Sequence, residues 1–273
     1  MPYQTVLVEK KDGIATVRFN RPEKRNAMSP QLHKDMTAVL EDLRYDDEAR
    51  VLVLAGAGKA FCAGMDLKQF FIELNDNRSE YDRILRLALE WRGRTLRYYP
   101  KPTIAMIHGY CFGGAFSIVE GCDLAIAAED TTFGLSEINF GMFPGGTVSK
   151  SMANLMGPRD ALWYGMLGRT FDGKTAQQMK FINLAVPAAD LEKETMKVAA
   201  ELVTKDPIAL RCVKEAYRHS LEMPWEAAMG LSSAKESEVA YLQNDAWKKT
   251  GIGDFLKGKY KPGLGGRGTG GGS

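Results

Sequence analysis

The chain is poor in histidine, in cysteine and in net charge, and each shortage excludes a class of site or partner. Among its 273 residues are three histidines, too few to favour a histidine metal centre. The four cysteines lie apart with no CxxC spacing, which predicts buried free thiols rather than disulfides or a zinc site. A formal net charge of +2 at pH 7 gives no support for nucleic-acid binding.

Long apolar runs are also absent. The chain begins MPYQTVLVEKK, without a charged start followed by an apolar stretch, and no window approaches the ~20 apolar residues of a membrane helix. We therefore expect a cytoplasmic protein with no membrane partner. The length suits one large domain, or one domain with a helical appendage.

The order of apolar segments indicates an α/β protein with a helical C-terminal part. Two β-branched runs split by residues 11–13 predict a hairpin, residues 51–55 predict a buried strand, and residues 81–99 predict a long amphipathic helix. From Leu191 onward the pattern is helical. We therefore expect three regions: a core in residues 1–190, a helical region in residues 191–260, and a flexible glycine-rich tail or expression remnant in residues 261–273.

Residues 103–146 carry the densest set of chemical signals. Gly113 and Gly114 precede the apolar start of a helix, where a ligand can approach the backbone closely and amide hydrogens are unpaired. Glu137 follows among apolar neighbours, which should raise its proton affinity toward working pH. Together with the hydroxyl of Ser117, these residues predict an oxyanion site beside a carboxylic acid.

A second glycine turn spans residues 56–68, between the strand at residues 51–55 and a helix that starts at Met65. It matches neither the Walker spacing nor the GxGxxG fingerprint. Two such turns can each aim one amide at the same carbonyl oxygen, and two donors make an oxyanion hole. The alternative is a pair of ordinary turns, but the carboxylate that follows favours a site.

A basic turn at residues 21–26 precedes a helix that Ser29 can cap and Pro30 can begin. On charge alone we interpret it as an ordinary solvated turn. Contact of Lys24 or Arg25 with a ligand phosphate is the alternative.

Four motifs occur in an order that resembles the crotonase superfamily of acyl-CoA enzymes. They are AGMDLK at residues 63–68, HGYCFGG at 108–114, CDLAIA at 122–127 and FGLSE at 133–137. The resemblance covers nearly the whole chain. It implies an α/β spiral of strand-strand-helix units, with a helical C-terminal region that forms a homo-oligomer, a trimer or a dimer of trimers. It implies an acyl-CoA substrate and no separate cofactor, since coenzyme A is part of the substrate.

The same resemblance assigns roles to individual positions. The amides of Met65 and Gly114 would form the oxyanion hole for the thioester carbonyl. The coenzyme A moiety would be held at Lys24, Ala63, Leu67 and Lys68. The substrate pocket would include Phe70, Ser136, Phe140, Ser233 and Tyr241.

The choice of reaction depends on two positions. Simple enoyl-CoA hydratases carry a glutamate where Ser117 stands, and they use it with a second glutamate that Glu137 matches. Serine there, with NAMSP at residues 26–30 and LSEINFG at 135–141, is similar to hydroxycinnamoyl-CoA hydratase-lyases. Those enzymes hydrate feruloyl-, caffeoyl- or 4-coumaroyl-CoA and split the adduct by a retro-aldol step to an aromatic aldehyde, of the vanillin type, and acetyl-CoA. Glu137 would then move the protons, and Ser117 would hydrogen-bond the substrate or be satisfied within its own helix.

The ring end of the pocket departs from that pattern. Two tyrosines grip the para-hydroxyl in the hydratase-lyases, whereas the matching positions here are Phe70 and Ser233. Tyr241, eight residues further on, could replace one of them. The alternatives are an enoyl-CoA hydratase or isomerase with another acyl-CoA substrate, and a scaffold protein on the same fold.

Overall fold

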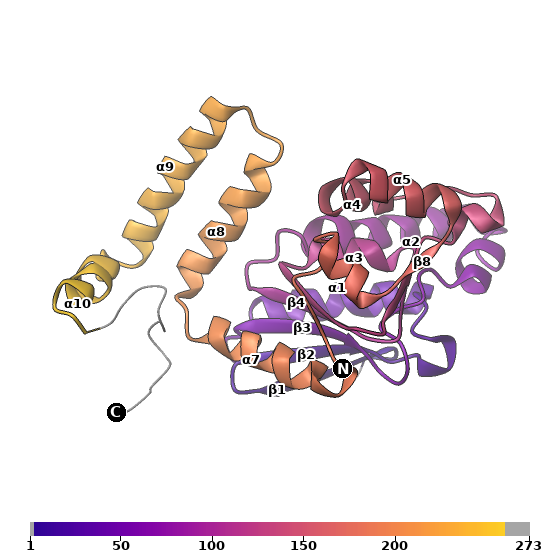
Figure 1. The fold of residues 1–273 in the computed structure, drawn as a ribbon, viewed down its shortest axis with the longest axis horizontal. Coiled ribbons are helices and arrows are strands. Elements are labelled where there is room, and N and C mark those ends of the chain that lie inside the picture. The colour runs from indigo at the N-terminus through magenta and orange to yellow at the C-terminus, as the bar shows by residue number, and fades with distance from the viewer. Residues whose placement is uncertain (1–2, 260–273) are drawn as a thin grey trace. The chain divides into compact units, whose positions relative to one another are not determined.

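The computed structural model describes residues 3–259, so the predicted tail at residues 261–273 lies outside the described residues. The chain divides into two compact units, Met1–Ala199 and Ala200–Ser273 (Figure 1). Within residues 3–259, no helix combines the length and the apolar character needed to span a membrane.

A six-stranded sheet forms the centre of the first unit, in the order β1-β2-β3-β4-β6-β9. β1 and β2 pair antiparallel as the predicted hairpin, and the other neighbours are parallel. β3 is buried at all six residues, as parallel strands covered on both faces are. The six strands are β1 (Val6–Lys11), β2 (Ile14–Phe19), β3 (Val51–Gly56), β4 (Thr103–Ile107), β6 (Leu124–Ala128) and β9 (Leu184–Val186).

A smaller sheet, in the order β5-β7-β8, is formed by short strands, two of which follow central strands closely in the sequence. It consists of β5 (Tyr110–Phe112), β7 (Thr132–Gly134) and β8 (Thr170–Phe171). The sequence analysis did not predict it, because strands of two or three residues are too short to show a period. β5 follows β4 after two residues and β7 follows β6 after three, so this sheet holds the loops that leave the central strands.

In the first unit, α1 contacts β1 of the central sheet and packs against α2, while α4 packs against α3. Ser29 Oγ accepts a hydrogen bond from the Leu32 amide at 3.2 Å, and Pro30 occupies the first turn, which confirms the predicted helix start. The helical segments are η1 (Pro22–Lys24), α1 (Pro30–Arg44), η2 (Leu67–Ile72), α2 (Arg78–Glu90), η3 (Trp91–Thr95), α3 (Ala115–Gly121), η4 (Glu137–Phe140), α4 (Val148–Leu155), α5 (Pro158–Leu167), α6 (Gly173–Gln178), η5 (Ala188–Asp190) and α7 (Leu191–Val203), the last of which crosses the boundary between the units.

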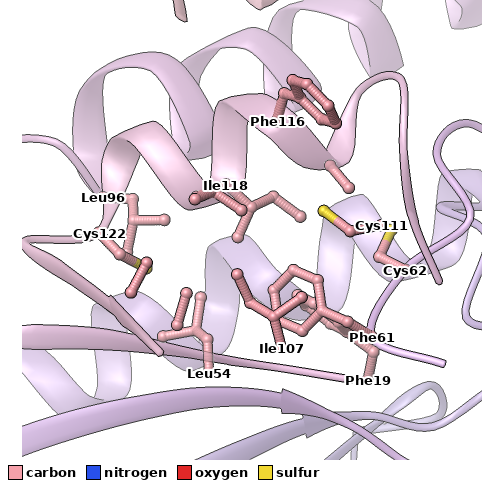
Figure 2. Close-up of a cluster of buried hydrophobic side chains, with 14 of the residues drawn as sticks. Phe19, Leu54, Phe61, Cys62, Leu96, Ile107, Cys111, Phe116, Ile118 and Cys122 are labelled. Carbon is pink, nitrogen blue, oxygen red and sulfur yellow. The ribbon is translucent and has the colours of Figure 1, made fainter. Parts of the chain in front are cut away.

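The hydrophobic core lies between the sheet and α3, all seven residues of which are buried. Figure 2 shows Ile118 of α3 pointing toward Ile107 of β4 and Leu54 of β3, whereas Phe116 lies on the other side of the helix. There its ring packs against the rings of Phe133 and Phe181. Complete burial fixes the orientation of α3. All four cysteines are buried thiols, as predicted.

The second unit is helical, as expected for the C-terminal region. Asp206 caps α8 by accepting a hydrogen bond from the Ala209 amide at 2.8 Å, and Pro207 begins the helix. Two ion pairs join α8 to α9, Arg211 with Glu238 and Lys235 with Glu215. The helices are α8 (Pro207–Ser220), α9 (Trp225–Leu242), η6 (Trp247–Ile252) and α10 (Gly253–Leu256).

Candidate active site

Three loops that carry predicted site residues leave the carboxyl ends of adjacent parallel strands. The glycine turn at residues 57–66 follows β3, the turn at residues 108–114 follows β4, and the segment that leads to Glu137 follows β6. Since β3, β4 and β6 are parallel neighbours, their carboxyl ends meet at one edge of the sheet. In open α/β sheets this edge is where ligands bind.

The first glycine turn presents the amide of Met65. The Met28 amide donates to the Gly64 carbonyl at 2.7 Å, and the Asp66 amide donates to the Met28 carbonyl at 3.0 Å. These bonds hold the Gly64 carbonyl, which shares a peptide group with the Met65 amide, and the peptide group that follows it. The Met65 amide itself donates no hydrogen bond within residues 3–259. Gly64 has a φ of +91°, and a Cβ there would lie 2.9 Å from the Phe112 carbonyl oxygen, so the turn requires glycine.

The second glycine turn presents the amide of Gly114 at the N-terminal end of α3. The Gly113 amide donates to the Gly134 carbonyl at 3.0 Å, which ties the turn to β7. Gly114 occupies the N-cap position, and in the described part of the chain its amide has no acceptor.

The two turns are in contact. A Cβ on Gly64 would stand 3.7 Å from the Gly114 amide nitrogen, and a Cβ on Gly114 would stand 3.6 Å from Met65 Cγ. Two amides without protein acceptors therefore belong to touching loops, as an oxyanion hole requires. Their catalytic role stays a prediction.

Glu137 lies beside the second turn, at the start of η4. Its Oε1 stands 2.7 Å from where a Cβ on Gly113 would be. Its Oε2 is buried and has no hydrogen-bond partner among the described residues. Burial raises the pKa of this carboxyl, more than the contact with its own backbone amide lowers it. A carboxyl whose pKa is raised toward neutrality suits general acid and base chemistry.

Ser117 is buried on α3, and Thr147 Oγ1 donates a hydrogen bond to its Oγ at 2.7 Å. Thr147 directly precedes α4. The partner of the serine hydroxyl is thus a side chain from another element, rather than a carbonyl of its own helix. The sequence analysis did not find Thr147, because nothing in the sequence pairs it with a residue 30 positions earlier.

Phe70, the fourth residue of η2, lies in a buried aromatic group. Its ring centroid is 6.1 Å from that of His33 and 5.2 Å from that of Tyr81. From the sequence, Tyr81 was expected only as the first residue of the long helix at residues 81–99. Ser136 is half-buried and Phe140 is exposed, and both adjoin Glu137 along the chain.

The residues predicted to hold coenzyme A come from two loops that are joined to each other. The Ala63 amide donates to the Arg25 carbonyl at 2.9 Å, and Arg21 forms an ion pair with Asp66 at 2.9 Å. The predicted residues Lys24, Ala63, Leu67 and Lys68 therefore share one region of the surface. Lys68 is exposed, with Glu73 as its ion-pair partner at 3.3 Å.

Ser233 and Tyr241 lie on α9 in the second unit, and both are exposed there. Their part in the substrate pocket stays a prediction. No group of three or more potential metal ligands occurs among residues 3–259.

Comparisons with known proteins identify a family and a named relative for this chain. The family described as Enoyl-CoA hydratase/isomerase matches residues 9–262. A protein of Pseudomonas fluorescens named hydroxycinnamoyl-CoA hydratase-lyase is 47% identical over 264 residues, which are 96% of each chain.

Solved structures give the same result for the fold. An enoyl-CoA hydratase of Mycobacterium smegmatis is 26% identical, with a TM-score of 0.85 over 93% of this chain and 96% of that one. An enoyl-CoA hydratase of Bacillus anthracis is 25% identical, with a TM-score of 0.84 over 93% and 97%. These likenesses confirm the crotonase-like α/β fold expected from the sequence.

Proposed function

The chain belongs to the enoyl-CoA hydratase/isomerase family, and from this premise we propose that it is a hydratase-lyase of hydroxycinnamoyl-CoA thioesters. Its substrate would be feruloyl-, caffeoyl- or 4-coumaroyl-CoA, and its products an aromatic aldehyde and acetyl-CoA. The relative named for this activity, similar over 96% of the chain, supports the proposal. The observation that carries it is the site itself, in which a buried Ser117 hydroxyl held by Thr147 accompanies the carboxyl of Glu137.

The first step would be hydration of the double bond. Water adds its hydroxyl to the β-carbon and a proton enters at the α-carbon. Glu137 would remove the proton of the attacking water as a carboxylate and then deliver a proton to the α-carbon as an acid. The para-oxygen of the ring is conjugated with the β-carbon and can carry charge that develops there, so one acid-base group can suffice.

The second step would be a retro-aldol cleavage. The β-hydroxyl gives up its proton to the Glu137 carboxylate, the bond between the α- and β-carbons breaks, and an aldehyde carbonyl forms at the β-carbon. The electron pair of the broken bond becomes the enolate of acetyl-CoA, which then takes a proton at the α-carbon. The amides of Met65 and Gly114 would bind the thioester oxygen, where negative charge develops in both steps.

Ser117 would orient the β-hydroxyl. Because Thr147 donates to its oxygen, the proton of Ser117 is available to a substrate oxygen. Attack by Ser117 as a nucleophile would need an adjacent base, and its hydrogen-bond partner is a threonine rather than a histidine.

The remaining features of the proposal come from the resemblance. We propose a homo-oligomer, a trimer or a dimer of trimers, in the cytoplasm. Several large apolar side chains of the first unit are exposed, and such surfaces are often covered in an assembly. They include Phe140, Phe143, Trp163 and Met166.

The test is to incubate the protein separately with feruloyl-CoA and crotonyl-CoA and to identify the products by chromatography. We expect vanillin and acetyl-CoA from the first, little change in the second, and neither reaction in the Glu137→Gln variant. Hydration of crotonyl-CoA without aldehyde from feruloyl-CoA would contradict the proposal.

One observation favours a second candidate, an enoyl-CoA hydratase or isomerase with a different acyl-CoA substrate. Phe70 has no group that can hydrogen-bond a phenol, and it is enclosed by other rings. Cinnamoyl-CoA, which lacks the ring hydroxyl, separates the two candidates. Conversion of cinnamoyl-CoA to a β-hydroxyacyl-CoA, without cleavage of any hydroxylated analogue, would support the second.

A further inference from the structure

Arg92 is a buried cation in contact with the candidate oxyanion hole. It is the second residue of η3, and only 5% of its surface is exposed. Its Nε donates to the Ala88 carbonyl at 2.9 Å, and its Nη1 donates to the Gly114 carbonyl at 3.0 Å. Within residues 3–259 its hydrogen-bond partners are carbonyls, and no carboxylate acts on its charge. A buried charge without a counter-ion is costly to the fold, so its retention calls for a functional explanation.

The guanidinium is close to the amide that would bind the thioester oxygen. Nη1 lies 2.7 Å from where a Cβ on Gly114 would stand. A Cβ stands about 2.5 Å from its own amide nitrogen, so Nη1 is within about 5 Å of the Gly114 nitrogen. Among the described residues, Nη2 has no hydrogen-bond partner. It is nevertheless not one of the fully buried polar atoms that lack a partner. Nη2 therefore borders solvent-accessible space.

The ionisable groups next to Arg92 are neutral, so they do not offset its positive charge. Burial raises the pKa of the Cys62 thiol to about 12, so the thiol is neutral. Burial, assisted by the charge of Arg92, holds the pKa of His33 well below its usual range. His33 Nδ1 accepts a hydrogen bond from the Trp91 indole at 3.0 Å, which is consistent with a neutral ring. Burial lowers the pKa of Arg92 itself only to about 10, so it stays charged at neutral pH.

We propose that Arg92 is a positioning residue of the oxyanion hole, holding Gly114 through its carbonyl and placing a permanent positive charge near the Gly114 amide to stabilise the thioester enolate. The inference rests on the proposed function for the identity of that enolate, the one released when the α–β bond breaks. Inside a site with few water molecules, a fixed charge at this range acts with little screening.

The first experiment measures enolate stabilisation without turnover. Acetoacetyl-CoA is an enolisable thioester, and the absorbance of its enolate can be followed against pH when it is bound to each variant. Arg92→Met should retain binding but raise the apparent pKa of the bound thioester by about one unit, which is tenfold less enolate at a given pH. Arg92→Lys, which keeps the charge, should lie close to the wild type.

The matched control is Arg94→Gln, on the same turn but with an exposed side chain, and it should not change the enolate fraction. Circular dichroism of each variant checks folding, and Arg92→Gln replaces Arg92→Met if that variant does not fold. Equal enolate fractions in the wild type and in the uncharged variant would overturn the inference, even if the variant melts earlier, because a purely structural role predicts that result.

A second experiment separates this inference from the proposed function. With feruloyl-CoA, Arg92→Met should lower kcat at least tenfold and leave KM within about twofold, since a charge that acts on the enolate affects the transition state more than the bound substrate. If the wild type forms no aldehyde, the proposed function fails while the acetoacetyl-CoA result still decides the role of Arg92. If the wild type forms aldehyde and Arg92→Met keeps its kcat, the inference alone fails.

Discussion

Thr147 Oγ1 donates a 2.7 Å hydrogen bond to Ser117 Oγ, which links the residue before α4 to the middle of α3. The bond occupies one lone pair of the serine oxygen, so the serine hydroxyl can still donate its proton to another acceptor. The orientation of Ser117 therefore depends on a residue outside its own helix.

Removal of this hydroxyl pair should be non-additive. We expect Thr147→Val and Ser117→Ala each to lower kcat/KM for feruloyl-CoA about tenfold, and the double variant to lose little more than Ser117→Ala alone, because Thr147 acts through Ser117. Thr147→Ser keeps the donor and is the control. Full additivity in the double-mutant cycle would show that the two residues act independently.

Glu137→Gln should remove most of the turnover while the protein still binds coenzyme A thioesters. The amide cannot take up and return a proton, a function that contributes roughly 10²- to 10⁴-fold in rate. Steady-state kinetics and isothermal titration with acetyl-CoA measure the two quantities. Retention of more than about half of the wild-type kcat would exclude Glu137 as the acid-base group.

The ionisation of Glu137 should also appear in the stability of the protein. Burial raises the pKa of this carboxyl in the folded state above its usual range. The folded protein thus holds the proton more tightly than the unfolded chain, and this contribution to stability is full at low pH and is lost as the pH rises through the folded-state pKa. Glutamine does not ionise, so Glu137→Gln should gain stability relative to the wild type as the pH rises from the ordinary carboxylate range toward neutrality.

Urea denaturation of both proteins across that range checks the sign. Glu9→Gln, at an exposed position of β1, is the matched control for the loss of one carboxylate. A relative stability of Glu137→Gln that falls as the pH rises would contradict a raised pKa.

Gly113→Ala should impair catalysis beyond its effect on stability. Gly113 has a φ of +51°, so alanine there costs about 1–2 kcal/mol of backbone strain, and its Cβ would displace the Glu137 carboxyl 2.7 Å away. Gly141→Ala has a similar strain, with a φ of +74°, but its Cβ would meet nothing within 4 Å. Thermal unfolding should therefore report comparable losses for both variants, whereas kcat should fall only in Gly113→Ala. A similar kcat in the two variants would show that the position of Glu137 is not constrained by Gly113.

Much of the fold was predictable because local signals agreed with the tertiary structure. The apolar run at residues 51–55 became the buried strand β3, and Ser29 with Pro30 began α1 as their residue types predict. Gly64 and Gly113 have positive φ angles and sit in the two turns that the sequence identified. Apolar neighbours indicated that the pKa of Glu137 would be raised, and burial in the structure raises it.

The predicted long helix through residue 99 was partly wrong. α2 ends at Glu90, and the Leu96 amide donates to the Trp91 carbonyl at 2.9 Å, five residues back, in a widened turn. Such a turn inserts an extra residue and rotates the side chains that follow. The helical period of the sequence therefore could not show which way Arg92 faces.

By itself, then, the sequence determined the longer strands, the start of α1, the two glycine turns and the carboxylate, since these depend on residues adjacent in the chain. Only the tertiary structure decided which side chains support them. Arg92 reaches the Gly114 carbonyl across 22 positions, and Thr147 reaches Ser117 across 30. Periodicity reports that a side chain is buried, but its partner is set by the packing of separate elements at the carboxyl edge of the sheet.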